Sequence, residues 1–384
     1  MNYLEKVSDA NTLIDAFHQS KKECYWKESV QRYEINLLTN IRQTQKELQS
    51  GTYKQQDFYE FELNERGHQR HIKAMHIYDR VVQRAVCDNV LIPALTKYLI
   101  HDNGASMKGK GIDFTRKRFE QHLRQFYRKY GNDGYILQID YSKFFDNIRH
   151  EPLIEAMADK IKDPKIMKLV TQLIDAFKVD VSFTEKDLYN EIFNALEYAE
   201  KVPKEAQTGK RYMRKSLGIG SQISQIGGIF YPTRVDNYCK IVRGCKFYGR
   251  YMDDIYAIHH DKAYLKGLLD DIISVSAEIG LYINPKKTHI VKLSHGFTFL
   301  KTKYYLTDTG KIVKRLSRSN ITRQRKKLKK FRKLVDEGKM TMADVENQYK
   351  SWIGVAKDYD SFHTRQAMMK LYGELFPPSF YHKN

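Results

Sequence analysis

Apolar side chains recur along this chain with two spacings, one typical of helices and one of strands. Residues 1–50 repeat apolar side chains every three or four positions, which predicts helices that end at Gly51. The same spacing returns in residues 79–99 and in residues 263–280, where Gly280 marks the end. We therefore expect these three stretches to be helical, each with one buried face.

Alternating or short apolar runs predict the strands. Residues 59–75 form two alternating runs about a Glu-Arg-Gly turn, which indicates a β-hairpin. Residues 135–140 are a short apolar run that ends in aspartate, typical of a central strand. Residues 244–260 predict strand, turn and strand, and residues 297–316 predict a second hairpin.

The remaining stretches are assigned by period and polarity. One helix is expected over residues 151–177, and the chain after residue 316 is expected to be mainly helical. Residues 178–212 are more polar and fit neither period, and we expect an inserted helical excursion there. Strands and helices follow one another without regular βαβ alternation, which indicates an α+β fold rather than a doubly wound sheet.

Composition adds a large positive charge to this pattern. The 384 residues include 66 Lys and Arg against 46 Asp and Glu, a net charge of +20, and 41% are hydrophobic. That apolar share is enough for a packed core, and the length suggests two or three domains. Residues 285–384 hold 23 Lys and Arg against 8 Asp and Glu, so they carry +15 of the charge. The excess indicates a polyanionic partner, and it argues against a binder of acidic proteins or a simple small-molecule enzyme.

The spacing of the cysteines and the hydropathy of the chain indicate in which cellular compartment the protein resides. The four cysteines, at 24, 87, 239 and 245, show no metal-ligand or redox spacing, which is typical of reduced thiols. No apolar run approaches the roughly 18 residues that a membrane span needs. The first residues also lack the basic-then-apolar layout of a signal peptide. We expect a cytoplasmic protein with no membrane partner.

Two groups of aspartates follow predicted strands. Asp140 ends the run 135–140, and Asp253 and Asp254 stand between two strand segments. Adjacent carboxylates repel one another unless a cation neutralises them, although Asp is also an ordinary residue of solvated turns. Carboxylates on neighbouring strands can hold two Mg²⁺ ions about 4 Å apart, which activate a 3′-hydroxyl and stabilise the leaving pyrophosphate.

The order of motifs along the chain resembles the reverse transcriptases. Residues 140–146 and 251–254 are similar to the catalytic motifs of that family, and the resemblance covers roughly residues 30–376. The other segments that match in order are 67–72 with 79–83, 105–111, 219–225, 280–288, 297–300 and 348–354. The subtypes that the chain resembles are bacterial: group II intron-like enzymes, those of diversity-generating retroelements, and defence-associated relatives.

The resemblance implies a right-hand polymerase, in which fingers and palm combine an antiparallel sheet with helices and the thumb is α-helical. Residues 1–50 would be an N-terminal helical extension and residues 51–134 the fingers. Residues 135–296 would be the palm, with the inserted segment at about 178–212. Residues 297–384 would form the primer grip and the basic α-helical thumb.

The resemblance also assigns the catalytic and metal-binding residues. Asp140, Asp253 and Asp254 would be catalytic and would ligate two Mg²⁺ ions, with Mn²⁺ as a substitute and the Tyr141 carbonyl as a further ligand. Phe145 would be a steric gate whose ring leaves no room for a 2′-hydroxyl, and so selects deoxynucleotides.

The remaining site residues would bind the nucleotide or the template–primer. Arg70 would contact the triphosphate and Lys287 would lie near the pyrophosphate as a proton donor, although both also fit ordinary exposed charges. The other nucleotide-binding residues would be Gly220 and Gln225. The expected primer- and template-binding residues are Tyr251, Met252, Leu300, Arg323, Lys326, Lys327, Lys329 and Lys330.

The last five of these lie in a strongly basic run. Residues 311–333 contain 12 Lys and Arg and no Asp or Glu, and their apolar residues keep helical spacing. One face of such a helix can pack while the other follows phosphates. The alternative is a solvated helix face.

Two departures from the family pattern bear on the site. Many members have Gln-Gly and Ser-Pro where this chain has Ile219-Gly220 and Ser224-Gln225, a form that resembles the retroelement and defence enzymes. This change predicts an altered nucleotide pocket and leaves fidelity open. Leu300 is followed by lysine where the primer grip often has glycine, which puts the detailed grip geometry in question.

The resemblance thus implies an RNA-directed DNA polymerase that extends a 3′-hydroxyl with dNTPs. Its partners would be an RNA template or a structured noncoding RNA, a DNA or RNA primer, the cDNA product and an accessory protein. Retroelement mutagenesis and antiphage defence both fit. One alternative is a polymerase with restricted or untemplated DNA synthesis, and another is a non-catalytic RNA-binding scaffold.

Overall fold

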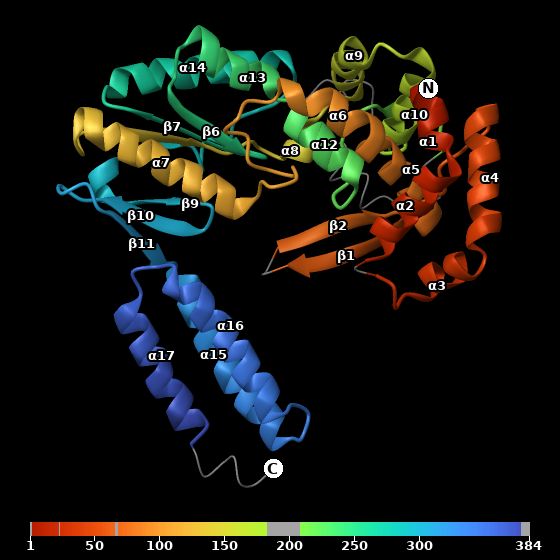
Figure 1. The fold of residues 1–384 in the computed structure, drawn as a ribbon. Helices are drawn as coiled ribbons and strands as arrows, with labels where there is room; N and C mark the ends of the chain where they lie inside the picture. The colour runs from red at the N-terminus through yellow and green to blue at the C-terminus, as the bar shows by residue number, and fades with distance from the viewer. Residues whose placement is uncertain (1, 23, 66–67, 183–207, 378–384) are drawn as a thin grey trace. The chain divides into compact units, whose positions relative to one another are not determined.

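The computed structural model describes residues 2–22, 24–65, 68–182 and 208–377 (Figure 1). Among these residues the α-helices are α1 (Tyr3–Ser8), α2 (Ala10–Lys21), α3 (Glu28–Ile35), α4 (Leu37–Ser50), α5 (Ile77–Val86), α6 (Ile92–Leu95), α7 (Ile112–Tyr130), α8 (Phe144–Asn147), α9 (His150–Ile161), α10 (Pro164–Asp175), α12 (Gln222–Phe230), α13 (Thr233–Asn237), α14 (Lys262–Glu278), α15 (Arg318–Asp336), α16 (Met342–Lys357) and α17 (Phe362–Leu375). Tighter or wider helical turns continue some of them, at η1 (Cys87–Leu91), η2 (Thr96–Tyr98) and η5 (Tyr238–Val242). A separate tight turn, η6 (Leu293–His295), follows a strand.

The strands of the described chain form four small sheets. They are β1 (Tyr59–Glu65), β2 (His68–Ala74), β3 (Tyr135–Ile139), β4 (Val179–Asp180), β5 (Tyr212–Met213), β6 (Phe247–Tyr251), β7 (Asp254–His259), β8 (His289–Lys292), β9 (Phe297–Phe299), β10 (Thr302–Leu306) and β11 (Ile312–Leu316). The sheet orders are β1-β2, β11-β10-β9, β6-β7-β3-β8 and β4-β5. The pairings β1–β2, β3–β8, β4–β5, β9–β10 and β10–β11 are antiparallel. This mixture of helices and antiparallel sheets confirms the expected α+β class.

Most of the expected elements are present. Residues 1–50 fold as the four helices α1 to α4, and Gly51 ends α4 in the left-handed region with φ 70°. The predicted hairpin is β1–β2, which pairs Tyr59 with Ala74 and Glu65 with His68. The predicted strand–turn–strand is β6 and β7, and α14 stops two residues before Gly280. Spacing alone therefore located these elements well.

The single helix expected over residues 151–177 is wrong, because the chain makes two helices, α9 and α10. Lys162 ends α9 in the left-handed region with φ 54°. The Asp163 carboxylate then caps α10 by accepting two backbone N–H groups, and Pro164 occupies the first turn. Asp followed by Pro is a recognised helix start, and the apolar period hid it.

The inserted segment and the second predicted hairpin also differ from expectation. Residues 183–207 of the expected helical excursion lie outside the described residues, and its described ends pair as strands β4 and β5. The predicted hairpin at 297–316 is a three-stranded sheet, β9-β10-β11. An additional tight turn at Leu300 and Lys301 creates the third strand, with both residues at positive φ (45° and 65°). Such turns normally use Asn or Gly, so residues 300 and 301 carry no turn signal.

Packing divides the chain into two compact units. Unit 1 comprises residues 1–111, 139–255 and 267–288, and unit 2 comprises residues 112–138, 256–266 and 289–384. The division into extension, fingers, palm and thumb remains a prediction.

Within unit 1, a buried carboxylate joins the N-terminal helices to the hairpin region. Asp79 of α5 is fully buried. Its carboxylate accepts the Tyr53 hydroxyl at 2.8 Å and the Gln56 backbone N–H at 3.2 Å. Burial raises the pKa of Asp79 to about 6, and these two hydrogen bonds oppose that shift only in part.

This raised pKa predicts a pH-dependent stability that Asp79→Asn removes. Between pH 4 and pH 6 the folded chain holds a proton on Asp79 that the unfolded chain releases, so this carboxyl lowers the stability of the wild type as pH rises. Asn does not titrate. We therefore expect the stability of the variant relative to wild type to increase by about 3 kcal/mol from pH 3.5 to pH 7. Urea unfolding at a series of pH values measures this, and a difference that does not change with pH would contradict it.

Unit 2 has an aromatic core and a separate helical bundle. The buried Phe119 ring of α7 contacts Tyr256, Phe297, Phe299 and Tyr304, with ring centroids 4.8–5.7 Å apart. Helices α15, α16 and α17 pack against one another (Figure 1). Their shared core contains Leu328, Phe331, Val335, Val345, Met368 and Phe376.

Two further features of the described residues are the state of the cysteines and the hydropathy of the helices. All four cysteines are buried. In the described part of the chain, no helix combines the length and the apolar character needed to span a bilayer.

Candidate active site

The two aspartates of the 251–254 motif stand at a tight turn between β6 and β7. Met252 takes a left-handed conformation with φ 57°, which is unusual for a residue with a side chain. Such strain persists only where the surroundings hold it, and it is frequent at functional sites. β7 then continues into the core through the buried run Ile255–Ile258. The turn is therefore anchored on its C-terminal side by a buried strand.

Asp140 follows β3 and is held by the segment that precedes β8. The Asn284 backbone N–H donates to the Asp140 carbonyl at 2.8 Å, and the Ser142 N–H donates to the Tyr282 carbonyl at 2.7 Å. Each oxygen of the Asp140 carboxylate accepts a hydrogen bond from Lys287 Nζ, at 3.2 Å for Oδ1 and 3.1 Å for Oδ2. The structure thus brings together Asp140 and Lys287, two of the predicted site residues.

Asp253 lies within electrostatic range of this pair. Its pKa is raised, first because the carboxyl is partly buried and then because the Asp140 charge repels its own, while Lys287 and Arg250 reduce the shift. The neighbouring Tyr251 phenol has a raised pKa as well, because of burial and of the Asp254 and Asp253 charges. The site therefore gathers carboxylates whose repulsion a cation would relieve.

The donor set of these carboxylates fits a divalent cation that substrate also helps to bind. Among the described residues, no group of three His, Cys, Asp or Glu side chains is arranged to hold an ion. Mg²⁺, however, often binds through only one or two carboxylates together with substrate phosphates. The coupled pair Asp140 and Asp253 supplies that many oxygen ligands, so these residues fit such a cation. The Tyr141 side chain does not supply a ligand, because it is buried and its hydroxyl meets Ser276 Oγ at 3.0 Å. The ligand expected from this residue is its backbone carbonyl.

Phe145 and Met252 meet at one point of α12. A Cβ atom added at Gly228 would lie 3.1 Å from both Phe145 Cε1 and Met252 Sδ. Glycine at this position lets the helix approach both side chains. The predicted gate and the predicted primer-end residue therefore share one corner of the site.

Gly220 and Gln225 line a polar cavity of about 480 Å³ in unit 1. Gly220 has φ 100°, and Ser221 caps α12 by accepting the Ser224 N–H at 3.0 Å. Arg80 and Gln83 of α5 line the same cavity. Residues of the 79–83 and 219–225 motifs, far apart in sequence, thus face the same space.

The other predicted residues lie elsewhere. Arg70 belongs to β2, where its backbone pairs with Leu63. Leu300 lies in unit 2, where its carbonyl accepts the Arg116 Nη2 group at 2.6 Å. The basic residues Arg323, Lys326, Lys327, Lys329 and Lys330 are exposed on α15 of the same unit.

Sequence reasoning missed a buried charge pair, Arg250 and Asp236, next to the 251–254 turn. Both side chains are 0% exposed and form an ion pair at 2.7 Å. The signal was available, because an arginine stood inside an otherwise apolar strand segment directly before the aspartates. Charged residues are seldom buried without a partner.

The sequence of residues 54–304 matches the family described as reverse transcriptase (RNA-dependent DNA polymerase). This match spans more than half of the chain. The chain belongs to the reverse transcriptase family. It therefore has the α+β polymerase fold that the motifs predicted, and it belongs to a family of RNA-directed nucleotidyltransferases that use divalent metal ions.

Similarity to solved structures is low in sequence and partial in coverage. Telomerase from Candida tropicalis, truncated from its C-terminal domain, is 15% identical with a TM-score of 0.46, over 67% of this reverse transcriptase and 55% of that chain. Telomerase from Candida albicans, in complex with a fragment of telomeric RNA, is 12% identical with a TM-score of 0.46, over 85% and 56% of the two chains. The chain thus spans about half the length of these structures. No curated protein matches it.

Proposed function

We propose that this chain is an RNA-directed DNA polymerase that extends a 3′-hydroxyl with dNTPs on an RNA template. The observation that carries the proposal is the sheet order β6-β7-β3-β8, which places β7 beside β3. Asp140 directly follows β3 and Asp253 directly precedes β7, and the Asp140 charge contributes to the raised pKa of Asp253 although 113 positions separate them. Repelling carboxylates placed at a strand end and at a strained turn favour a cation-dependent reaction. Family membership supplies the reaction class.

Asp140, Asp253 and Asp254, with the Tyr141 carbonyl, would hold two Mg²⁺ ions. When bound, these ions would lower the pKa of the 3′-hydroxyl and stabilise the charge of the leaving pyrophosphate. Lys287 stands 3.1 Å from Asp140 and can keep a proton close to the leaving phosphates. Arg70, Gly220 and Gln225 would complete the nucleotide site.

Phe145 would select the sugar of the incoming nucleotide. Its Cε1 atom and Met252 Sδ would each lie 3.1 Å from a Cβ atom at Gly228 of α12, so this ring edge faces the helix at a glycine. We expect Phe145→Ala to raise the kcat/KM for a ribonucleotide relative to the matching deoxynucleotide at least about tenfold. Single-nucleotide incorporation measures this ratio. Phe362→Ala on α17, a phenylalanine that is 60% exposed, is the control, and an unchanged ratio in the Phe145 variant would remove the gate role.

The basic α15 face would bind the template–primer, and Tyr251, Met252 and Leu300 would contact the primer end. The cytoplasmic context that we propose is a bacterial retroelement or an antiphage defence system with a dedicated structured RNA and an accessory protein. Sequencing nucleic acids that co-purify with the chain separates these two programmes. Variable-repeat cDNA would favour the retroelement, and a short product of a noncoding RNA would favour defence.

Primer extension tests the polymerase proposal directly. The chain is incubated with a defined RNA template, an annealed primer, dNTPs and Mg²⁺, and the products are sequenced. Products that copy the template support the proposal. Polymer that forms equally well without a template would instead favour untemplated synthesis, and no extension with any template would favour an RNA-binding scaffold.

A further inference from the structure

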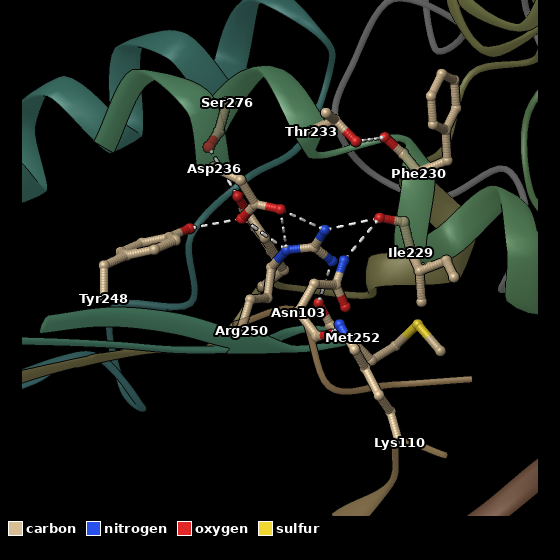
Figure 2. Close-up of polar contacts among 11 residues, drawn as sticks. Asn103, Lys110, Ile229, Phe230, Thr233, Asp236, Tyr248, Arg250, Met252 and Ser276 are labelled. Carbon is tan, nitrogen blue, oxygen red and sulfur yellow. Dashed lines mark hydrogen bonds and ion pairs between the residues drawn. The ribbon is translucent and has the colours of Figure 1, made fainter. Parts of the chain in front are cut away.

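A fully buried ion pair lies beside the strained turn that carries Asp253. Arg250 donates from Nε and Nη2 to both oxygens of Asp236, at 2.7–3.1 Å. Tyr248 also donates its hydroxyl to Asp236 Oδ1 at 2.8 Å (Figure 2). Burial disfavours the arginine charge, yet Asp236 outweighs burial and the pKa of Arg250 is raised. The guanidinium is therefore a fixed, charged donor.

The same guanidinium reaches two backbone carbonyls that belong to different elements. Nη1 donates to the Met252 carbonyl at 2.9 Å, inside the turn where Met252 has φ 57°. Nη2 donates to the Ile229 carbonyl at 2.7 Å, near the end of α12. Figure 2 shows both bonds converging on Arg250. One side chain thus connects the turn of the catalytic aspartates to α12, the helix that carries Gly228 against Phe145.

A loop that leads into the fingers motif at 105–111 is attached at the same place. The Arg250 N–H donates to the Asp102 carbonyl and the Gly104 N–H donates to the Arg250 carbonyl, both at 3.0 Å. Asn103 Nδ2 donates to the Ile229 carbonyl at 3.2 Å, and Lys110 Nζ donates to the Asn103 carbonyl at 2.9 Å. The backbone of Arg250 therefore binds this loop, while its side chain binds the turn and α12.

Stability alone does not account for this arrangement. A buried ion pair is often no more stabilising than apolar residues of similar volume, because removing both charges from water is costly. An apolar pair, however, offers no donor to the Met252 carbonyl. What arginine adds is a planar set of donors that can satisfy a carboxylate and two carbonyls together.

We infer that Arg250, fixed by Asp236, is a positioning residue that holds the strained 251–254 turn and so sets the place of Asp253 and Asp254. The inference rests on the proposed polymerase function, because its main consequence is for nucleotide addition. It predicts that the turn loosens and turnover falls when the guanidinium is lost, even where the fold and nucleic-acid binding are kept.

The experiment compares two variants that share the Tyr248→Phe substitution and differ in the buried charge pair. Tyr248→Phe is the reference, since it keeps Arg250 and Asp236 and removes only a hydroxyl. The test variant adds Arg250→Met and Asp236→Leu, which removes both charges together and leaves no unpaired hydroxyl. A separate Arg250→Lys variant keeps a buried positive charge but cannot reach Asp236 and both carbonyls at once.

Three assays are applied to each folded protein. They measure kcat with KM for dNTP, the Kd for template–primer, and hydrogen exchange in peptides that cover residues 247–259. We expect Tyr248→Phe to stay within about twofold of wild type in all three. In the test variant and in Arg250→Lys we expect kcat per folded molecule to fall at least about tenfold, Kd to stay within about twofold, and exchange at the turn to quicken.

Where the wild type extends primers, an unchanged kcat per folded molecule or an unchanged exchange rate at the turn overturns the positioning role. A fall in activity that only follows the folded fraction overturns it as well. If the wild type extends no primer, the polymerase proposal fails by itself. Exchange at the turn then decides the positioning role alone, and equal exchange in the test variant and Tyr248→Phe would overturn it.

Discussion

Asp253→Asn is expected to reduce nucleotide addition about a thousandfold while the chain stays folded. The substitution keeps the size of the side chain but removes a charged oxygen from the pair with Asp140. Losing such a ligand removes several kcal/mol of transition-state stabilisation, and about 4 kcal/mol corresponds to a factor of a thousand. Single-turnover extension of a primer on an RNA template measures the loss.

The raised pKa of Asp253 makes this test cleaner. Because burial and Asp140 raise that pKa, the folded chain binds the proton more readily than the unfolded chain, and the ionised carboxylate lowers stability at pH values above the folded pKa. Asparagine carries no charge, so in buffer without divalent cations the variant should be at least as stable as wild type at pH 7.5. A loss of activity therefore reports on chemistry and not on unfolding.

Glu155→Gln on α9 is the matched control, because it removes one exposed carboxylate of unit 1 outside the site. We expect wild-type extension from it and unchanged template–primer binding from both variants. An Asp253→Asn variant that extends primers as fast as the control would remove Asp253 from catalysis. If it also kept the biological activity of the chain, the scaffold alternative would be favoured over the polymerase.

The candidate catalytic carboxylates stand out in the sequence because local signals mark them. Asp140 ended an apolar strand, and Asp253 and Asp254 interrupted another apolar stretch, so each position was visible without knowledge of the fold. Their mutual approach depended on the order of strands in the β6-β7-β3-β8 sheet, which no local pattern contains. Only the order of the family motifs indicated that these aspartates belong to one site.

Features that depend on distant partners escaped the sequence. Arg250 can be buried only because Asp236 lies opposite it, and a strand pattern alone does not reveal a partner on the preceding helix. The turn at Leu300 and Lys301 escaped for a different reason, since neither residue favours positive φ. The break at Asp163–Pro164 does have a local signal, because Asp before Pro favours a helix start, but the apolar period runs through it without interruption.

Neutralising four lysines of α15, by changing Lys326, Lys327, Lys329 and Lys330 to Gln, is expected to weaken template–primer binding about a hundredfold at 0.1 M salt. The four side chains are exposed, while Leu328 and Phe331 of the same helix pack into the bundle core. The substitutions should therefore spare the bundle. The slope of log Kd against log salt should fall by about 0.7–0.9 for each phosphate that the variant no longer neutralises.

The control separates a local phosphate-binding face from a general effect of net charge. Changing Lys27, Lys46, Lys165 and Lys168 to Gln removes the same charge from exposed positions of unit 1. If α15 binds phosphates, this control keeps most of its affinity and its salt slope, because the slope counts only the phosphates that the exchanged lysines neutralise. Turnover at saturating template–primer should survive in both variants, because Asp140 and Asp253 lie in unit 1 and are unchanged. Equal losses in the two variants would mean that the net charge of +20 acts as a diffuse attraction, and the α15 face would then be an ordinary solvated surface.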